Sequence, residues 1–231
     1  MNYSLWNQFE NFVNEDYEKC FSPVSVLPYL ALKHNFNHEK IIKDLDDDYC
    51  LKNISLMDIS KLINDFYSFS GIKNENAFKF IMHEVIDNMY EHSHFTQAYA
   101  LSKACANIID YCFLDNGISI QKSFENNNFD FKDDCDAILK AINGKSTKQV
   151  SGYIERGYGL NNIISLLTLE NNGSVLIASR KGAVYIDGNK IYLKELSKKS
   201  IEGTLICLRF EVNQDFDNFY SLIDGFHNFE V

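Results

Sequence analysis

Glycine and proline are distributed unevenly along this chain of 231 residues, and that distribution constrains what each part can fold into. Only Gly71 falls before position 116, and the other ten of the eleven glycines lie from Gly117 onward. Both prolines, Pro23 and Pro28, lie early. Glycine supplies the backbone freedom that tight turns need. We therefore expect residues 1–70 to form a mainly helical N-terminal extension, and residues 71–231 to form a domain with strands and turns.

The composition excludes several classes of protein. Apolar residues make up 45% of the chain, which is enough for a sizeable buried core. The formal net charge of −10 argues against a nucleic-acid groove, because the phosphates would be repelled. No apolar run approaches eighteen residues, no signal peptide is recognisable, and the six cysteines include no Cys-x-x-Cys pair. We expect a cytoplasmic protein with reduced cysteines that binds neither nucleic acid nor membranes.

From residue 74 onward, periodicity and turn residues predict an α+β domain. The predicted helices span residues 74–94 and 159–171, and the predicted strands span 105–114, 174–179, 183–187 and 203–212. Residues 121–150 are polar and are predicted to form a helix and a loop, and Asp187-Gly188-Asn189 is typical of a hairpin turn. We expect helices layered on a mixed, mostly antiparallel sheet.

Four short segments contain residues suited to chemistry, and the first is the helix around residues 83–92. Glu84, Asn88 and Glu91 are four and seven residues apart, so their side chains converge on one face of that helix. A carboxylate beside an amide oxygen suits an attacking water and a Mg²⁺ ion that keeps several waters. An ordinary polar helix face would show the same spacing.

The second segment delivers Asp115 from an apolar strand into an Asn-Gly turn. Its carboxylate could accept a hydrogen bond from an exocyclic amine, and Gly117 would let the backbone approach a flat ring. The third, Gly157-Tyr158-Gly159-Leu160, is a glycine pair that opens a helix, where backbone N–H groups can bind phosphate. The fourth, Gly203-Thr204, opens the last apolar strand and indicates nothing by itself.

In this order the four segments resemble the GHKL ATPase superfamily, which includes gyrase B, a heat-shock chaperone, the histidine-kinase catalytic domain and MutL. The resemblance covers about residues 74–212. It implies the Bergerat fold, a two-layer α/β sandwich in which helices cover one face of the sheet and ATP lies between the layers under a mobile lid. One departure is Ser119, which stands where the family often has a second glycine after the aspartate.

The resemblance also implies roles for individual residues. Glu84 would be the general base, Asn88 the Mg²⁺ ligand, Asp115 the residue that recognises adenine, and Thr204 a support for the adenine pocket. The remaining ATP-binding residues implied by the helix, the turn and the lid are Glu91, Gly117, Lys145, Thr147, Arg156, Gly157, Gly159 and Leu160.

Within the superfamily, Glu84 makes the chain more similar to the branches that hydrolyse ATP or phosphorylate serine than to histidine kinases. The chain lacks a downstream transducer domain, and its size is similar to that of the stand-alone anti-sigma-factor serine kinases and of small ATP-binding proteins found beside STAS-like partners. We therefore expect a Mg²⁺-dependent ATP-binding protein, either a regulatory ATPase or a Ser/Thr protein kinase, that acts with a protein partner. Two alternatives remain: an ATP-hydrolysing clamp that forms a homodimer through residues 1–70, and a nucleotide sensor without turnover.

Overall fold

The computed structural model of the chain describes residues 4–68, 70–144, 159–169, 171–212, 215–217, 219 and 229. Within these residues, a seven-stranded sheet runs through the centre of the molecule in the order β1-β2-β3-β7-β4-β5-β6. Its strands are β1 (Cys50–Asn53), β2 (Ala98–Cys105), β3 (Ile108–Asp115), β4 (Ser174–Arg180), β5 (Gly182–Asp187), β6 (Lys190–Glu195) and β7 (Ile201–Glu211). Each neighbouring pair of these strands is antiparallel, so the described sheet is not mixed.

Eight α-helices accompany the sheet in the described part of the chain. They are α1 (Leu5–Val13), α2 (Pro23–Lys33), α3 (His38–Lys43), α4 (Ile59–Ser68), α5 (Glu75–His92), α6 (Ile120–Asn126), α7 (Asp134–Ile142) and α8 (Gly159–Thr168). Single 3₁₀ turns cover Tyr17–Lys19 and Ile54–Leu56. Among these helices, none is long and apolar enough to cross a lipid bilayer.

Helix α5 has well-defined ends. The Asn74 side chain accepts a hydrogen bond from the Ala77 N–H (3.0 Å), and Glu75 places a negative charge at the positive end of the helix. At the other end, the Ser93 N–H and hydroxyl both donate to the Met89 carbonyl. The helix predicted over residues 74–94 is therefore confirmed.

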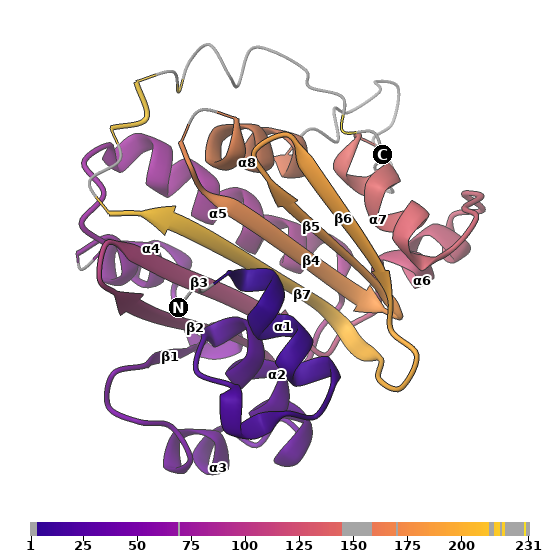
Figure 1. Cartoon of the computed structure of the whole chain (residues 1–231), viewed down its shortest axis with the longest axis horizontal. Coiled ribbons are helices and arrows are strands. Elements are labelled where there is room, and N and C mark those ends of the chain that lie inside the picture. The colour runs from indigo at the N-terminus through magenta and orange to yellow at the C-terminus, as the bar shows by residue number, and fades with distance from the viewer. Residues whose placement is uncertain are drawn as a thin grey trace.

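One face of the sheet is covered by α4, α5, α7 and α8 (Figure 1). Side chains alternate along a strand, so every second residue of β3 and β7 points into this core. The residues concerned are Ile109, Tyr111 and Phe113 on β3, and Ile206, Leu208 and Phe210 on β7.

The opposite face is covered by α1 and α2, which lie in front of the sheet in Figure 1. Their apolar residues, among them Phe9 and Leu27, pack against the intervening positions of the strands, such as Leu114 and Leu205. The prediction of helices on one face of the sheet thus holds for residues 71–231 only. The N-terminal helices α1 and α2 cover the other face and add a third layer. Residues 1–70 also supply β1, which pairs with β2, and α4, which packs against α5.

A buried ion pair attaches the third layer to the sheet. Asp110 on β3 lies directly opposite Arg209 on β7, and the guanidinium donates to both carboxylate oxygens, at 2.7 and 2.8 Å. The Ser22 hydroxyl, at the start of α2, donates to the same carboxylate (3.0 Å). The carboxylate therefore links two central strands and one helix.

Cys112 and Cys207 also face each other across β3 and β7, and they form a disulfide. Cys20, Cys50, Cys105 and Cys135 are free. The prediction that every cysteine is reduced is therefore wrong for this pair. The two residues are separated by 95 positions in sequence, and only the strand register brings them together.

Candidate functional site

Three polar residues, Asp115, Thr204 and Ser179, form a row on the three central strands of the sheet, β3, β7 and β4. The row lies at one end of these strands. Ser179 on β4 pairs with Thr204 on β7, and Leu114 on β3 pairs with Leu205, so Asp115 follows in register beside Thr204. By strand alternation, all three side chains share the face of the sheet that α5 covers. The row therefore lies between the sheet and the helical layer.

Asp115 is almost completely buried, with 1% of its surface exposed. One carboxylate oxygen, Oδ1, accepts a hydrogen bond from the Gly117 N–H (2.8 Å), and the other, Oδ2, is buried without a hydrogen-bond partner. Burial raises the pKa of this carboxyl to about 7, and the nearby Gly117 N–H, Ser93 hydroxyl and Thr204 N–H oppose the rise. The Ser93 hydroxyl itself donates to the Met89 carbonyl (2.8 Å).

Two glycines allow this close arrangement around Asp115. A Cβ atom on Gly117 would overlap the Ser93 carbonyl oxygen at the end of α5, to which the Ile118 N–H donates (2.6 Å). Gly203 has a φ of +73°, and a Cβ there would lie 2.6 Å from Asp115 Oδ1. Glycine at these positions lets the end of α5 pack against the turn that follows Asp115, and lets the start of β7 pack against Asp115 itself.

Ser119, which stands where the related pattern often has a second glycine, causes no distortion. Its backbone is extended (φ −70°), a conformation open to any residue. The Ser119 side chain caps α6 by accepting a hydrogen bond from the Lys122 N–H (3.0 Å). Ser119 therefore serves here as the N-cap of a helix.

The N-terminus of α8 lies against the predicted catalytic face of α5. A Cβ on Gly159 would overlap the Glu84 carboxylate and would lie 3.6 Å from Asn88 Nδ2. The Nδ2 atom of Asn88 is itself buried without a hydrogen-bond partner. The structure thus brings together Glu84, Asn88 and Gly159, at the helix end whose backbone N–H groups are not used within the helix.

Helix α5 connects this group to the polar row. Asn88 is five residues before Ser93, which corresponds to about 7.5 Å along the helix axis.

Of the other predicted site residues, Glu91 is exposed on α5, and Leu160 is half-buried and packs on the core. The other predicted site residues, Lys145, Thr147, Arg156 and Gly157, lie outside the described residues. Within the part of the chain that the structure describes, no three His, Cys, Asp or Glu side chains gather as a metal site.

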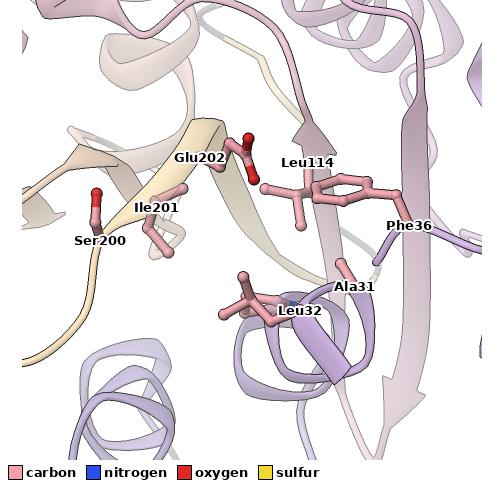
Figure 2. A pocket seen from close by; sticks show the side chains of 8 residues that line it. Ala31, Leu32, Phe36, Leu114, Ser200, Ile201 and Glu202 are labelled. Atoms are coloured by element: carbon pink, nitrogen blue, oxygen red, sulfur yellow. The ribbon is translucent and has the colours of Figure 1, made fainter. Parts of the chain in front are cut away.

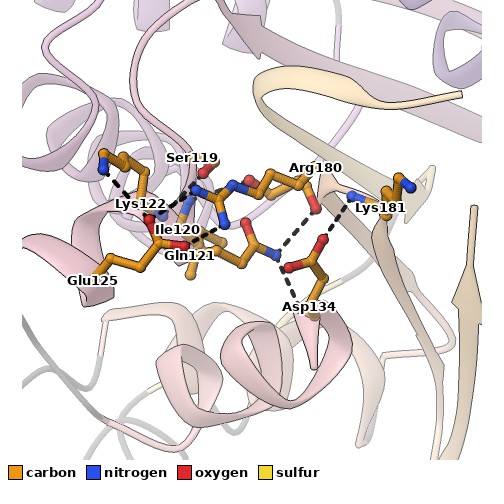
Figure 3. A network of polar contacts seen from close by, with 9 residues as sticks. Ser119, Ile120, Gln121, Lys122, Glu125, Asp134, Arg180 and Lys181 are labelled. Atoms are coloured by element: carbon orange, nitrogen blue, oxygen red, sulfur yellow. Dashed lines mark hydrogen bonds and ion pairs between the residues drawn. The ribbon is translucent and has the colours of Figure 1, made fainter. Parts of the chain in front are cut away.

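A polar network fixes α6 beside the row (Figure 3). Arg180 contacts both carboxylate oxygens of Glu125, at 2.5 and 3.0 Å. Gln121 donates to the carbonyls of Asp134 (2.9 Å) and Ser179 (3.1 Å). These contacts join the start of α6, the start of α7 and the end of β4, so Ser179 is held from several sides.

A small hollow lies near the same end of the sheet, on the side of the N-terminal helices (Figure 2). It is lined mainly by apolar side chains of α2 and by Phe36, Leu114 and Ile201, with Ser200 and Glu202 at its edge. Leu114 and Asp115 are consecutive, so their side chains point to opposite faces of the sheet. The hollow is thus separated from the polar row by the sheet itself.

Sequence patterns predicted Asp115, Thr204, Glu84 and Asn88, but not Ser179. A single serine in the strand Ser-Val-Leu-Ile-Ala-Ser-Arg carries no motif, and its position beside Thr204 depends on strand pairing. No protein-family model and no curated protein sequence matches this chain.

Proposed function

We propose that this chain is a Mg²⁺-dependent ATP-binding protein of the GHKL class, acting with a protein partner as a regulatory ATPase or Ser/Thr kinase. The observation that carries the proposal is the free Oδ2 oxygen of Asp115. A buried carboxylate oxygen without a partner is costly, and a ligand that donates a hydrogen bond would remove that cost. The exocyclic amine of adenine is such a donor.

The second half of the site supports the same proposal. The start of α8 is suited to bind an anion through its backbone N–H groups. The lack of a Cβ at Gly159 already lets one anionic group, the Glu84 carboxylate, lie directly against this helix end. Asn88 has a buried Nδ2 without a partner, and a half-turn of its amide exchanges nitrogen for oxygen, which can bind Mg²⁺. A Mg²⁺ ion that keeps several waters needs only one or two protein ligands besides the phosphates, whose charge it neutralises.

Glu84 lies beside Asn88 on α5, within the same group as Gly159. In this position it would accept the proton of an attacking water or of a partner's hydroxyl. An acceptor hydroxyl on a partner would make the protein a kinase, and water would make it an ATPase.

The binding claim is tested by calorimetry with ATP and Mg²⁺ on the wild type and on Asp115→Asn. The amide presents a donor where the ligand amine needs an acceptor, so affinity should fall by roughly 5-fold to 150-fold, or about 1–3 kcal/mol. Asp187→Asn, at the exposed β5–β6 turn, is the matched control and should bind as the wild type does. Equal affinity in Asp115→Asn and the wild type would refute the proposal.

The chemical claim gives two residues of α5 different roles, Glu84 in catalysis and Asn88 in Mg²⁺ binding. Glu84→Ala should leave ATP affinity within a few-fold but lower hydrolysis or phosphoryl transfer by roughly 10²–10⁴. Asn88→Ala should instead weaken the Mg²⁺-dependent part of ATP binding. Both variants are compared for phosphate release alone and for label transfer to a candidate partner. Turnover in Glu84→Ala equal to that of the wild type would remove Glu84 from the mechanism.

A further inference from the structure

Ser179 is fully buried at the end of β4, and its hydroxyl group contacts three residues of two other elements, β7 and α6. Its Oγ donates to the Gly203 carbonyl (2.8 Å), accepts from the Ile120 N–H at the start of α6 (3.2 Å), and lies 3.4 Å from Thr204 Oγ1. The pairing changes at this point, since Ser179 faces Thr204 but Arg180 faces Ile201. Ser179 therefore closes the bulge in which β7 carries Gly203.

The hydrogen of this hydroxyl has only one available direction. A carbonyl oxygen can only accept, so the single hydrogen of Ser179 must point to Gly203. Toward Thr204, Ser179 can then only accept, and the Thr204 hydroxyl must be the donor of their contact. Because Thr204 has no second hydrogen on its hydroxyl, it can only accept from any further group.

When the Asp115 carboxyl is ionised, the consequence is a site edge with two neighbouring acceptors. Thr204 Oγ1 and the free Oδ2 of Asp115 lie on the same face of adjacent strands. A 6-amino purine presents two N–H donors to such an edge. A 6-oxo purine presents a carbonyl oxygen, which would face two acceptors and stay unpaired.

We propose that Ser179 is a positioning residue that holds the Thr204 hydroxyl as an acceptor, so that the site selects 6-amino over 6-oxo purine nucleotides. The inference rests on the proposed function and adds to it a residue that acts through Thr204. Loss of the Ser179 hydroxyl would free the Thr204 hydrogen to donate to a 6-oxo group. Selectivity should then fall, even where affinity for the 6-amino nucleotide changes little.

The experiment compares ATP with inosine triphosphate, in the presence of Mg²⁺, by calorimetry on the full chain at a pH of about 8.5, above the pKa of Asp115, so that its carboxyl is ionised. Ser179→Ala should lower the ratio of the two dissociation constants by about 5-fold to 10-fold relative to the wild type. Ser174→Ala is the matched control, since Ser174 is also buried on β4 but lies at its other end. Its ratio should equal that of the wild type.

The outcomes separate the two claims. If the wild type binds neither nucleotide, the proposed function fails and this inference fails with it. If the wild type prefers ATP and Ser179→Ala keeps the same ratio, including the case where both affinities fall equally, only this inference is overturned. Should Ser179→Ala not fold, Thr204→Val deletes the acceptor with little change of shape. An unchanged ratio in Thr204→Val overturns the inference as well.

Discussion

At the scale of single residues, the fold disfavours the charge of Asp115. Burial raises its pKa from 3.8 to about 7, so between these values the folded state binds a proton that the unfolded state has lost. This group therefore makes the ligand-free protein less stable as the pH rises from about 4 to about 7. At 1.36 kcal/mol per pKa unit the loss is on the order of 4 kcal/mol at most.

Urea unfolding of the ligand-free protein at pH 5 and pH 8 checks this expectation. The free energy of unfolding of the wild type should decrease relative to that of Asp115→Asn between the two pH values, because asparagine does not titrate. A difference between wild type and variant that is the same at both pH values would contradict the assignment of the perturbed pKa to Asp115.

The residues of the polar row differ in how far sequence could predict them. Asp115 ends an apolar strand at a glycine turn, and Thr204 follows a glycine, so local patterns indicated both. Ser179 has no such neighbour, and its role arises from pairing with a strand 25 residues away. Strand register depends on the hydrophobic pattern of the whole sheet, which a single serine does not report.

At the scale of elements, the bulge of β7 is the feature that Gly203 makes possible. Gly203→Ala would force an L-residue to a φ of +73° and push a methyl group into Asp115. We expect a loss of about 2–4 kcal/mol in the free energy of unfolding, from backbone strain and overpacking together.

Gly188, in the β5–β6 hairpin, provides the matched control for Gly203. Its φ is also positive, at +58°, but the nearest atom to an added Cβ is 4.0 Å away. Gly188→Ala should therefore cost only about 1 kcal/mol, from the backbone conformation alone. If chemical denaturation gave both variants the same loss, the contact between Gly203 and Asp115 would not matter.

Some elements were predictable from sequence and others were not. The apolar spacing and the capping Asn74 define α5, and β7 stands out as a long apolar strand. Strand β2 was missed because its turn to β3 contains Ala106 at a φ of +55° instead of a glycine. Strand β6 was missed because it is mostly exposed and carries charges. In the described part of the segment predicted to hold one helix, the structure has two, α6 and α7.

At the scale of the whole molecule, the buried pair of Asp110 and Arg209 fastens the N-terminal layer to the sheet. Arg209→Leu would leave the Asp110 carboxylate buried without its counter-ion, at a cost of about 3–5 kcal/mol. Replacing both residues by leucine should recover much of that loss, because neither charge remains. Urea unfolding measures all three proteins.

The exposed pair of Asp16 and Lys19 is the control for this experiment, and Asp16→Ala should leave the stability nearly unchanged. An Arg209→Leu protein as stable as the wild type would show that the buried pair does not hold the layers together. The third layer itself was not predictable, because α1 and α2 reveal an apolar face but not the surface that it covers.

The row of Asp115, Thr204 and Ser179 also has a consequence for anyone who wishes to transplant this site into another scaffold. The three residues come from distant parts of the chain, and a slip of one residue in any of their strands would turn that side chain to the opposite face of the sheet. Copying only the short sequence segments would therefore transfer the residue types without the strand register that brings their side chains together. The unit to graft is three strands in fixed register, together with the glycines that let them close around one carboxylate.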